Sequence, residues 1–67
     1  MAARYEVFFR EGGEFKALAE LDTEADARTL ARLHSRTVRV PLIVAALMED
    51  GSREELCVYS DGAILNI

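Results

Sequence analysis

Two Asp-Gly dipeptides, Asp50-Gly51 and Asp61-Gly62, divide the last third of this chain into three apolar segments. Asp-Gly between alternating apolar residues is the strongest short signal of a β-hairpin, because both residues tolerate the positive φ angles of a two-residue turn. The sequence therefore predicts two consecutive antiparallel hairpins. The pairs that these turns predict are Ala45 with Leu56, Ile43 with Val58, Val58 with Leu65 and Leu56 with Ile67.

Both turns place the same apolar side chains on one face of the three strands. A slip of one residue would move every side chain to the other face, so this agreement supports both registers. We expect that face to form the core. Its residues are Ile43, Ala45, Leu47, Leu56, Val58, Leu65 and Ile67. The opposite face is half apolar and is either exposed or an association surface; it carries Leu42, Val44, Met48, Cys57, Tyr59 and Ile64.

The N-terminal third alternates in the same way and predicts a first hairpin. Tyr5, Val7 and Phe9 lie on one side of a strand from Arg4 to Arg10, the period-2 signature of a half-buried strand. A second strand from Glu14 to Leu21 places Phe15, Ala17, Ala19 and Leu21 on one side. We expect a three-residue loop, Glu11-Gly12-Gly13, with a left-handed glycine. This loop pairs Phe9 with Phe15, Val7 with Ala17 and Tyr5 with Ala19, and sets Arg10 opposite Glu14 and Arg4 opposite Glu20.

A helix start follows the first hairpin. Thr23 has the side chain of an N-cap, and acids in the next turn complement the helix dipole. The helix should run to about Ser35 or Arg36. Its expected inner stripe is Ala27, Leu30, Ala31 and His34, flanked by Leu33, and its expected outer row is Arg28, Arg32 and Arg36.

These elements predict one small α+β domain over residues 1–67, in the order ββαβββ. The expected architecture is a mostly antiparallel five-stranded sheet with one helix packed on one face, with Pro41 at the start of a strand. The composition is 51% apolar, which favours a compact globule over disorder. The apolar run from Pro41 to Met48 is too short to span a bilayer, and the N-terminus lacks an apolar signal core. We expect a cytoplasmic protein with no membrane partner.

Eight of the twelve carboxylates should gather at one end of this fold. If the first strand runs upward, the second descends to the helix start, and the third also descends to the Asp50-Gly51 tip. We call this group the acidic pole: Glu20, Asp22, Glu24, Asp26, Glu49, Asp50, Glu54 and Glu55. Acids at turns and helix N-termini are ordinary structural choices. Alternatively, acids about 6.6–6.8 Å apart along a strand imitate a line of phosphates and suit a basic partner surface.

No set of residues predicts catalysis, a metal site or a cofactor, so we expect a protein that is not an enzyme. His34 has no second histidine near it in sequence, and the single Cys57 fits a small apolar strand residue. Ser52 and Ser60 lie in turns without a nucleophile motif. The arginine row on the helix, extended by Arg39, fits either a solvated helix face or a phosphate contact.

The net charge of −4 disfavours direct binding to nucleic acid or anionic lipid and favours a basic protein partner. Two binding functions stay open. One is an inhibitor whose acidic pole occupies the nucleic-acid-binding surface of a host protein, acting as a monomer or a weak homodimer. The other is a regulatory, antitoxin-like or homodimeric module that uses the outer apolar face around Leu42, Val44, Tyr59 and Ile64. Salt separates them, because only a charge-led complex weakens steeply with ionic strength.

The segments Glu20-Leu21-Asp22-Thr23-Glu24-Ala25-Asp26 and Glu49-Asp50-Gly51-Ser52-Arg53-Glu54-Glu55 decorate one helix and a small antiparallel sheet in a short acidic chain. In size, charge and architecture this chain resembles phage-encoded anti-CRISPR proteins, most closely those directed at multi-subunit type I systems. The resemblance implies a stoichiometric inhibitor in the host cytoplasm. Its implied target is a CRISPR surveillance complex or its nuclease, and its implied effect is to block target DNA binding.

Overall fold

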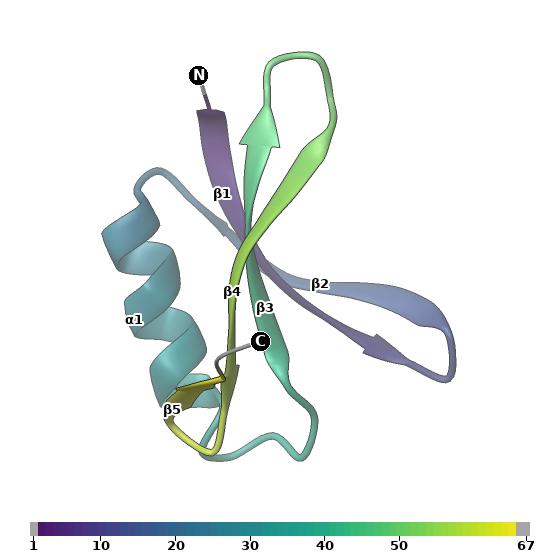
Figure 1. Cartoon of the computed structure of the whole chain (residues 1–67), viewed down its shortest axis with the longest axis vertical. Helices are drawn as coiled ribbons and strands as arrows, with labels where there is room; N and C mark the ends of the chain where they lie inside the picture. Colours follow the sequence, from purple (N-terminus) through teal and green to yellow (C-terminus); the bar gives the residue numbers. More distant parts are fainter. Residues whose placement is uncertain (1, 66–67) are drawn as a thin grey trace.

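The structure is a computed structural model that describes residues 2–65. It contains one five-stranded antiparallel sheet, in the order β2-β1-β3-β4-β5, and one helix that lies on one side of it (Figure 1). The predicted α+β fold and the order ββαβββ are confirmed. The elements are β1 (Ala2–Glu11), β2 (Glu14–Leu21), α1 (Glu24–His34), β3 (Leu42–Met48), β4 (Arg53–Ser60) and β5 (Ala63–Leu65).

Helix α1 begins and ends where its caps allow. Thr23 is extended, with φ −127°, and its hydroxyl oxygen accepts a hydrogen bond from the Asp26 amide at 3.2 Å. This bond satisfies one of the amides that a helix start leaves without a partner. At the other end, Ser35 caps the helix, and its amide donates to the Ala31 carbonyl at 2.9 Å. The predicted N-cap and helix end are confirmed.

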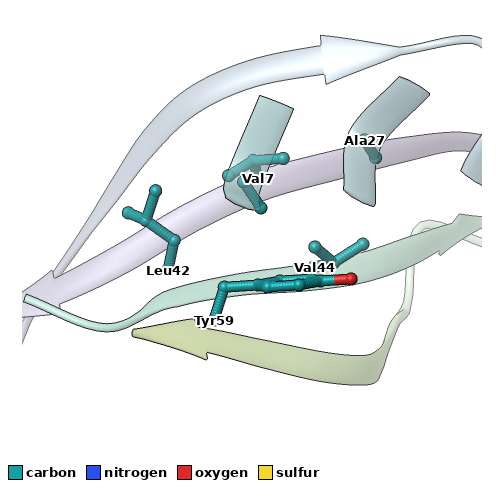
Figure 2. Close-up of a cluster of buried hydrophobic side chains, with 6 residues drawn as sticks. Val7, Ala27, Leu42, Val44 and Tyr59 are labelled. Atoms are coloured by element: carbon teal, nitrogen blue, oxygen red, sulfur yellow. The ribbon is translucent and has the colours of Figure 1, made fainter. Parts of the chain in front are cut away.

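The main core lies between α1 and the sheet. Ala27 and Ala31 are fully buried, and their small side chains let the helix approach the strands closely. Figure 2 shows Val7, Leu42, Val44 and Tyr59 of the sheet in the layer that also holds Ala27 of the helix. The buried members of this core are Val7, Ala27, Ala31, Leu42, Val44 and Tyr59.

The last turn of α1 differs from the expected inner stripe. His34 is exposed, and the neighbouring buried position is taken by Ser35, which is only 2% exposed. Ser35 fits there because its hydroxyl donates to the Arg32 carbonyl at 2.9 Å and accepts from the Gly62 amide at 2.8 Å. A buried polar side chain with both bonds made carries little desolvation cost.

The face of β3 and β4 that we expected to form the core is the wrong one. The helix covers Leu42, Val44 and Tyr59, whereas Ile43 and Val58 lie on the outer face. The reason is the pairing of β1 with β3, which sets Val7 directly beside Val44 and so continues the Tyr5, Val7 and Phe9 side of β1 onto this face. Of the association surface expected around Leu42, Val44, Tyr59 and Ile64, the first three residues are therefore buried beneath the helix, whereas Ile64 is exposed.

The β3–β4 turn is longer than predicted. The Met48 amide donates to the Ser52 carbonyl at 2.8 Å, which makes a three-residue turn with Gly51 at φ 89°. Ala45 consequently pairs with Glu55 and not with Leu56. A β-bulge then restores the expected register, because Leu56 is the extra residue between the Ala45 and Val44 pairs.

The two remaining C-terminal pairs agree with the sequence. Ile43 pairs with Val58, and Val58 with Leu65, as predicted. The Asp61-Gly62 turn has two residues, with φ angles of 51° and 80°, which are those of the expected hairpin turn. The predicted pair of Leu56 with Ile67 lies outside the described residues.

The first hairpin closes with a two-residue Gly12-Gly13 turn, so the predicted three-residue loop is wrong. Both glycines have positive φ angles, and Glu11 pairs with Glu14. A bulge at Leu18 separates β2 into two halves. Ala19 and Leu21 therefore lie on the helix side, whereas Phe15 and Ala17 lie on the outer side. The observed partners are Arg10 with Phe15, Phe9 with Lys16, Phe8 with Ala17, Val7 with Ala19, Glu6 with Glu20 and Tyr5 with Leu21.

The outer face of the sheet has a small apolar cluster of its own. Phe8, Ile43 and Ala45 are buried there, with Val58 packed against them. The Phe15 ring lies 4.8 Å from the Phe8 ring, between centroids, so the first hairpin folds its aromatic residue over this cluster. The outer face is consequently partly covered by the protein's own side chains.

Candidate functional site

The two acidic segments lie at the same end of the sheet. Tyr5 pairs with Leu21, and Ala2 pairs with Met48, so the end of β2 and the end of β3 flank the start of β1. Figure 1 shows the β3–β4 tip and the start of α1 both toward the top of the molecule, with the tip projecting beyond the sheet. The topology thus brings the helix start and this tip to one end, while their use as a binding surface stays a prediction.

Four carboxylates of the acidic pole form ion pairs within the chain. Arg4 lies 3.5 Å from both Glu20 and Asp22. The predicted register of Arg4 opposite Glu20 is wrong, because Glu20 lies opposite Glu6, but the two side chains still form an ion pair. Such exposed pairs contribute only about 0–1 kcal/mol to stability, yet they lower the charge that a partner meets. The other two pairs are Arg10 with Glu55 at 2.9 Å and Arg28 with Glu24 at 2.7 Å.

Arg53 is the basic residue nearest in sequence to the β3–β4 turn, and its side chain contacts Glu6 and Phe15 on the outer face of the sheet. Its Nε donates to the Glu6 carboxylate at 2.7 Å, and its guanidinium lies 4.5 Å from the centre of the Phe15 ring. Glu6 is only 3% exposed, so a charge partner offsets a large desolvation cost. Arg53 therefore pairs with Glu6 on the outer face of the sheet and not with the carboxylates at the β3–β4 turn.

The remaining carboxylates of the acidic pole are Asp26, Glu49, Asp50 and Glu54. Within residues 2–65, none of the four has a lysine or arginine nitrogen within 4.0 Å. We call Glu49, Asp50 and Glu54 the acidic tip. All three are exposed and belong to one hairpin.

Hydrogen bonds within the turn favour the charged form of the Asp50 carboxylate. The Ser52 hydroxyl donates to Asp50 Oδ1 at 2.6 Å, and the Ser52 amide donates to the same oxygen at 2.9 Å. These bonds, chiefly the one from the hydroxyl, hold the pKa of Asp50 below its ordinary value. Ser52 is thereby assigned a structural role in the turn.

No side-chain hydrogen bond joins the other candidate residues, Cys57, His34, Ser52 and Ser60, to one another in the described part of the chain. Cys57 is partly buried, and burial raises the pKa of its thiol, which disfavours the nucleophilic thiolate. His34 is exposed at the end of the helix. Among residues 2–65, no three His, Cys, Asp or Glu side chains are grouped as a metal site requires.

A hollow at the opposite end of α1 is the feature that sequence reasoning missed. Its volume is about 330 Å³, and it lies between the end of the helix and the β4–β5 turn. Arg36 and Arg39 were visible in the sequence as part of the arginine row, but their meeting with the Asp61-Gly62 turn depends on tertiary structure. The lining residues are Ser35, Arg36, Thr37, Val38, Arg39, Ser60 and Asp61.

Comparisons with protein-family models, curated proteins and solved structures give no significant match. In the described part of the chain, α1 is the single helix, and it is neither long nor apolar enough to cross a membrane.

Proposed function

We propose that this chain is a non-enzymatic binding protein whose acidic tip docks on a basic protein surface. The observation that carries this proposal is the withdrawal of Arg53 toward Glu6 and Phe15. Among residues 2–65, it leaves Glu49, Asp50 and Glu54 with no lysine or arginine nitrogen within 4.0 Å, on a projecting hairpin. Three like charges on one hairpin repel each other, and a basic partner would relieve that repulsion.

Charge also selects the class of partner. With a net charge of −4, the chain repels nucleic acid as a whole, and its tip repels phosphates most strongly. Proteins that handle nucleic acid present basic grooves to phosphates. An acidic tip that enters such a groove gains the same electrostatic steering as the natural ligand and competes with it.

The resemblance to anti-CRISPR proteins gives this proposal a specific form. In that form, the acidic tip occupies the DNA-binding surface of a type I surveillance complex in the host cytoplasm and blocks target DNA. The contact set of eight acids expected from the sequence then reduces to the acidic tip and Asp26. The other four acids are held by Arg4, Arg10 and Arg28.

The test of this form is equilibrium binding of a labelled target duplex to a purified type I surveillance complex with increasing amounts of the chain. We expect duplex binding to be lost as the chain reaches stoichiometric amounts, and the loss to weaken as salt increases. A Glu49→Gln/Glu54→Gln variant should compete poorly. The matched control is Glu11→Gln/Glu14→Gln at the tip of the first hairpin, which should compete like the native chain. Unchanged duplex binding at saturating chain would exclude a DNA-blocking inhibitor of the complex tested.

A further inference from the structure

The hollow at the end of α1 concentrates basic side chains in a protein that is acidic elsewhere. Arg36 and Arg39 line it, and neither has a carboxylate oxygen within 4.0 Å in the described residues. Asp61 is the one acidic residue in the lining, and it forms no ion pair with them within that distance. Two unneutralised guanidiniums beside one carboxylate make a site for a ligand with complementary groups.

The walls of the hollow are held by hydrogen bonds between segments that are distant in sequence. The Asp61 amide donates to the Ser35 carbonyl at 3.2 Å, and the Gly62 amide donates to the Ser35 hydroxyl at 2.8 Å. On the helix side, the Thr37 hydroxyl and the Val38 amide both donate to the His34 carbonyl at 3.0 Å. The lining backbone is therefore fixed before a ligand arrives, which lowers the entropic cost of binding.

The β4–β5 turn also shapes the position of Arg36. A Cβ atom added at Gly62 would lie 2.6 Å from Arg36 Nε, so the arginine side chain rests directly on this turn. Gly62 has φ 80°, a backbone conformation that the turn requires and that favours glycine. Because glycine has no side chain, nothing at this position pushes Arg36 away. The glycine thus lets Arg36 approach the turn that carries Asp61.

We propose that this hollow binds a small phosphate ester that carries free hydroxyl groups, such as a sugar phosphate. Arg36 and Arg39 bind the phosphoryl oxygens, because guanidinium groups donate paired hydrogen bonds to phosphate. The Asp61 carboxylate and the Ser60 hydroxyl bind hydroxyl groups of the ligand. This site lies outside the acidic tip and does not depend on the proposed function.

A single phosphoryl group fits this site better than a nucleic acid backbone. The hollow is small, and a long polyanion bound there would also meet the field of a chain with net charge −4. The C-terminal end of a helix carries partial negative charge and disfavours an anion. Affinity therefore depends on both arginines, which makes the site sensitive to their removal.

The test uses amide NMR spectra of the full chain titrated with ribose 5-phosphate, with ribose, and with inorganic phosphate. We expect saturable shifts confined to residues 35–39 and 60–62, strongest with ribose 5-phosphate. The double variant Arg36→Gln/Arg39→Gln should bind both phosphates at least about 10-fold more weakly. Arg32→Gln is the matched control, because Arg32 lies in the last turn of α1 and outside the lining, and the affinity of this variant should equal that of the native chain.

The variant Asp61→Asn separates the two halves of the site. Asparagine accepts the positive φ of this turn position, so the fold is kept. We expect this variant to bind ribose 5-phosphate at least about 3-fold more weakly than the native chain does. Its affinity for inorganic phosphate should be unchanged, because only the sugar hydroxyl groups contact Asp61. Three results would overturn the proposal: no saturable shifts, equal affinity in the double arginine variant, or tighter binding of single-stranded DNA than of ribose 5-phosphate at the same residues.

Discussion

Arg53 and Glu6, 47 positions apart in sequence, form a hydrogen-bonded ion pair of 2.7 Å on the outer face of the sheet. The pair joins β4 to β1 across β3. It stabilises the fold, because it gives the buried Glu6 a charge partner. It also leaves the β3–β4 tip acidic, because it takes the nearest arginine away from Glu49 and Glu54.

Breaking this pair from one side should destabilise the protein. Arg53→Ala leaves the Glu6 carboxylate buried without its partner, and we expect a loss of about 1–3 kcal/mol in the free energy of unfolding. This is below the usual range for buried pairs, because the Arg53 side chain is itself 43% exposed. The check is urea unfolding of Arg53→Ala, Glu6→Gln and the double variant. A double variant whose loss equals the sum of the single losses would show that the two residues are not coupled.

The helix side of the sheet should tolerate truncation least. Leu42 is fully buried under α1, so Leu42→Ala should cost about 2–5 kcal/mol, enough to unfold much of so small a domain. Leu65→Ala is the matched control, since Leu65 is 44% exposed on the outer face, and it should cost less than about 1 kcal/mol. Thermal unfolding of both variants checks this order. The reverse order would mean that the helix covers the other face.

Cys57 should react slowly in the folded protein. Burial raises the pKa of its thiol above the ordinary value, so the folded state favours the protonated form. The free energy of unfolding is therefore highest below the ordinary thiol pKa and falls as pH rises from that value through the raised one. A thiol reagent at about pH 8 should therefore label the native chain much more slowly than the urea-unfolded chain. Equal rates would contradict this environment, and a folded but inactive Cys57→Ser variant would assign the thiol a chemical role.

Local sequence signals predicted the order of elements and most of their ends. Thr23 and the Asp61-Gly62 turn are determined by residues close in sequence, and both predictions are confirmed. The bulges at Leu18 and Leu56 were missed, because an inserted residue within an apolar strand has no distinct local pattern. Each bulge shifts the register that a turn alone would set.

The candidate site shows the same limit. The placement of Glu49 and Asp26 at one end follows from strand directions, which the turns determine. The ion pairs that neutralise Glu55 and withdraw Arg53 join residues 45 and 47 positions apart. Contacts of that kind depend on the twist and packing of the whole sheet. No local pattern therefore reveals which carboxylates pair with an arginine and which do not.

The most direct measurement is the affinity of two charge-reversed chains for a basic partner that the native chain captures from bacterial lysate. Glu49→Lys/Glu54→Lys reverses the acidic tip and spares Asp50, whose carboxylate holds the turn through Ser52. Glu11→Lys/Glu14→Lys is the matched control at the other hairpin. We predict a loss of about 100-fold or more for the tip variant, a change within about 3-fold for the control, and weaker native binding at higher salt. Native affinity in a folded tip variant, or an equal loss in the control, would contradict the assignment of binding to the acidic tip.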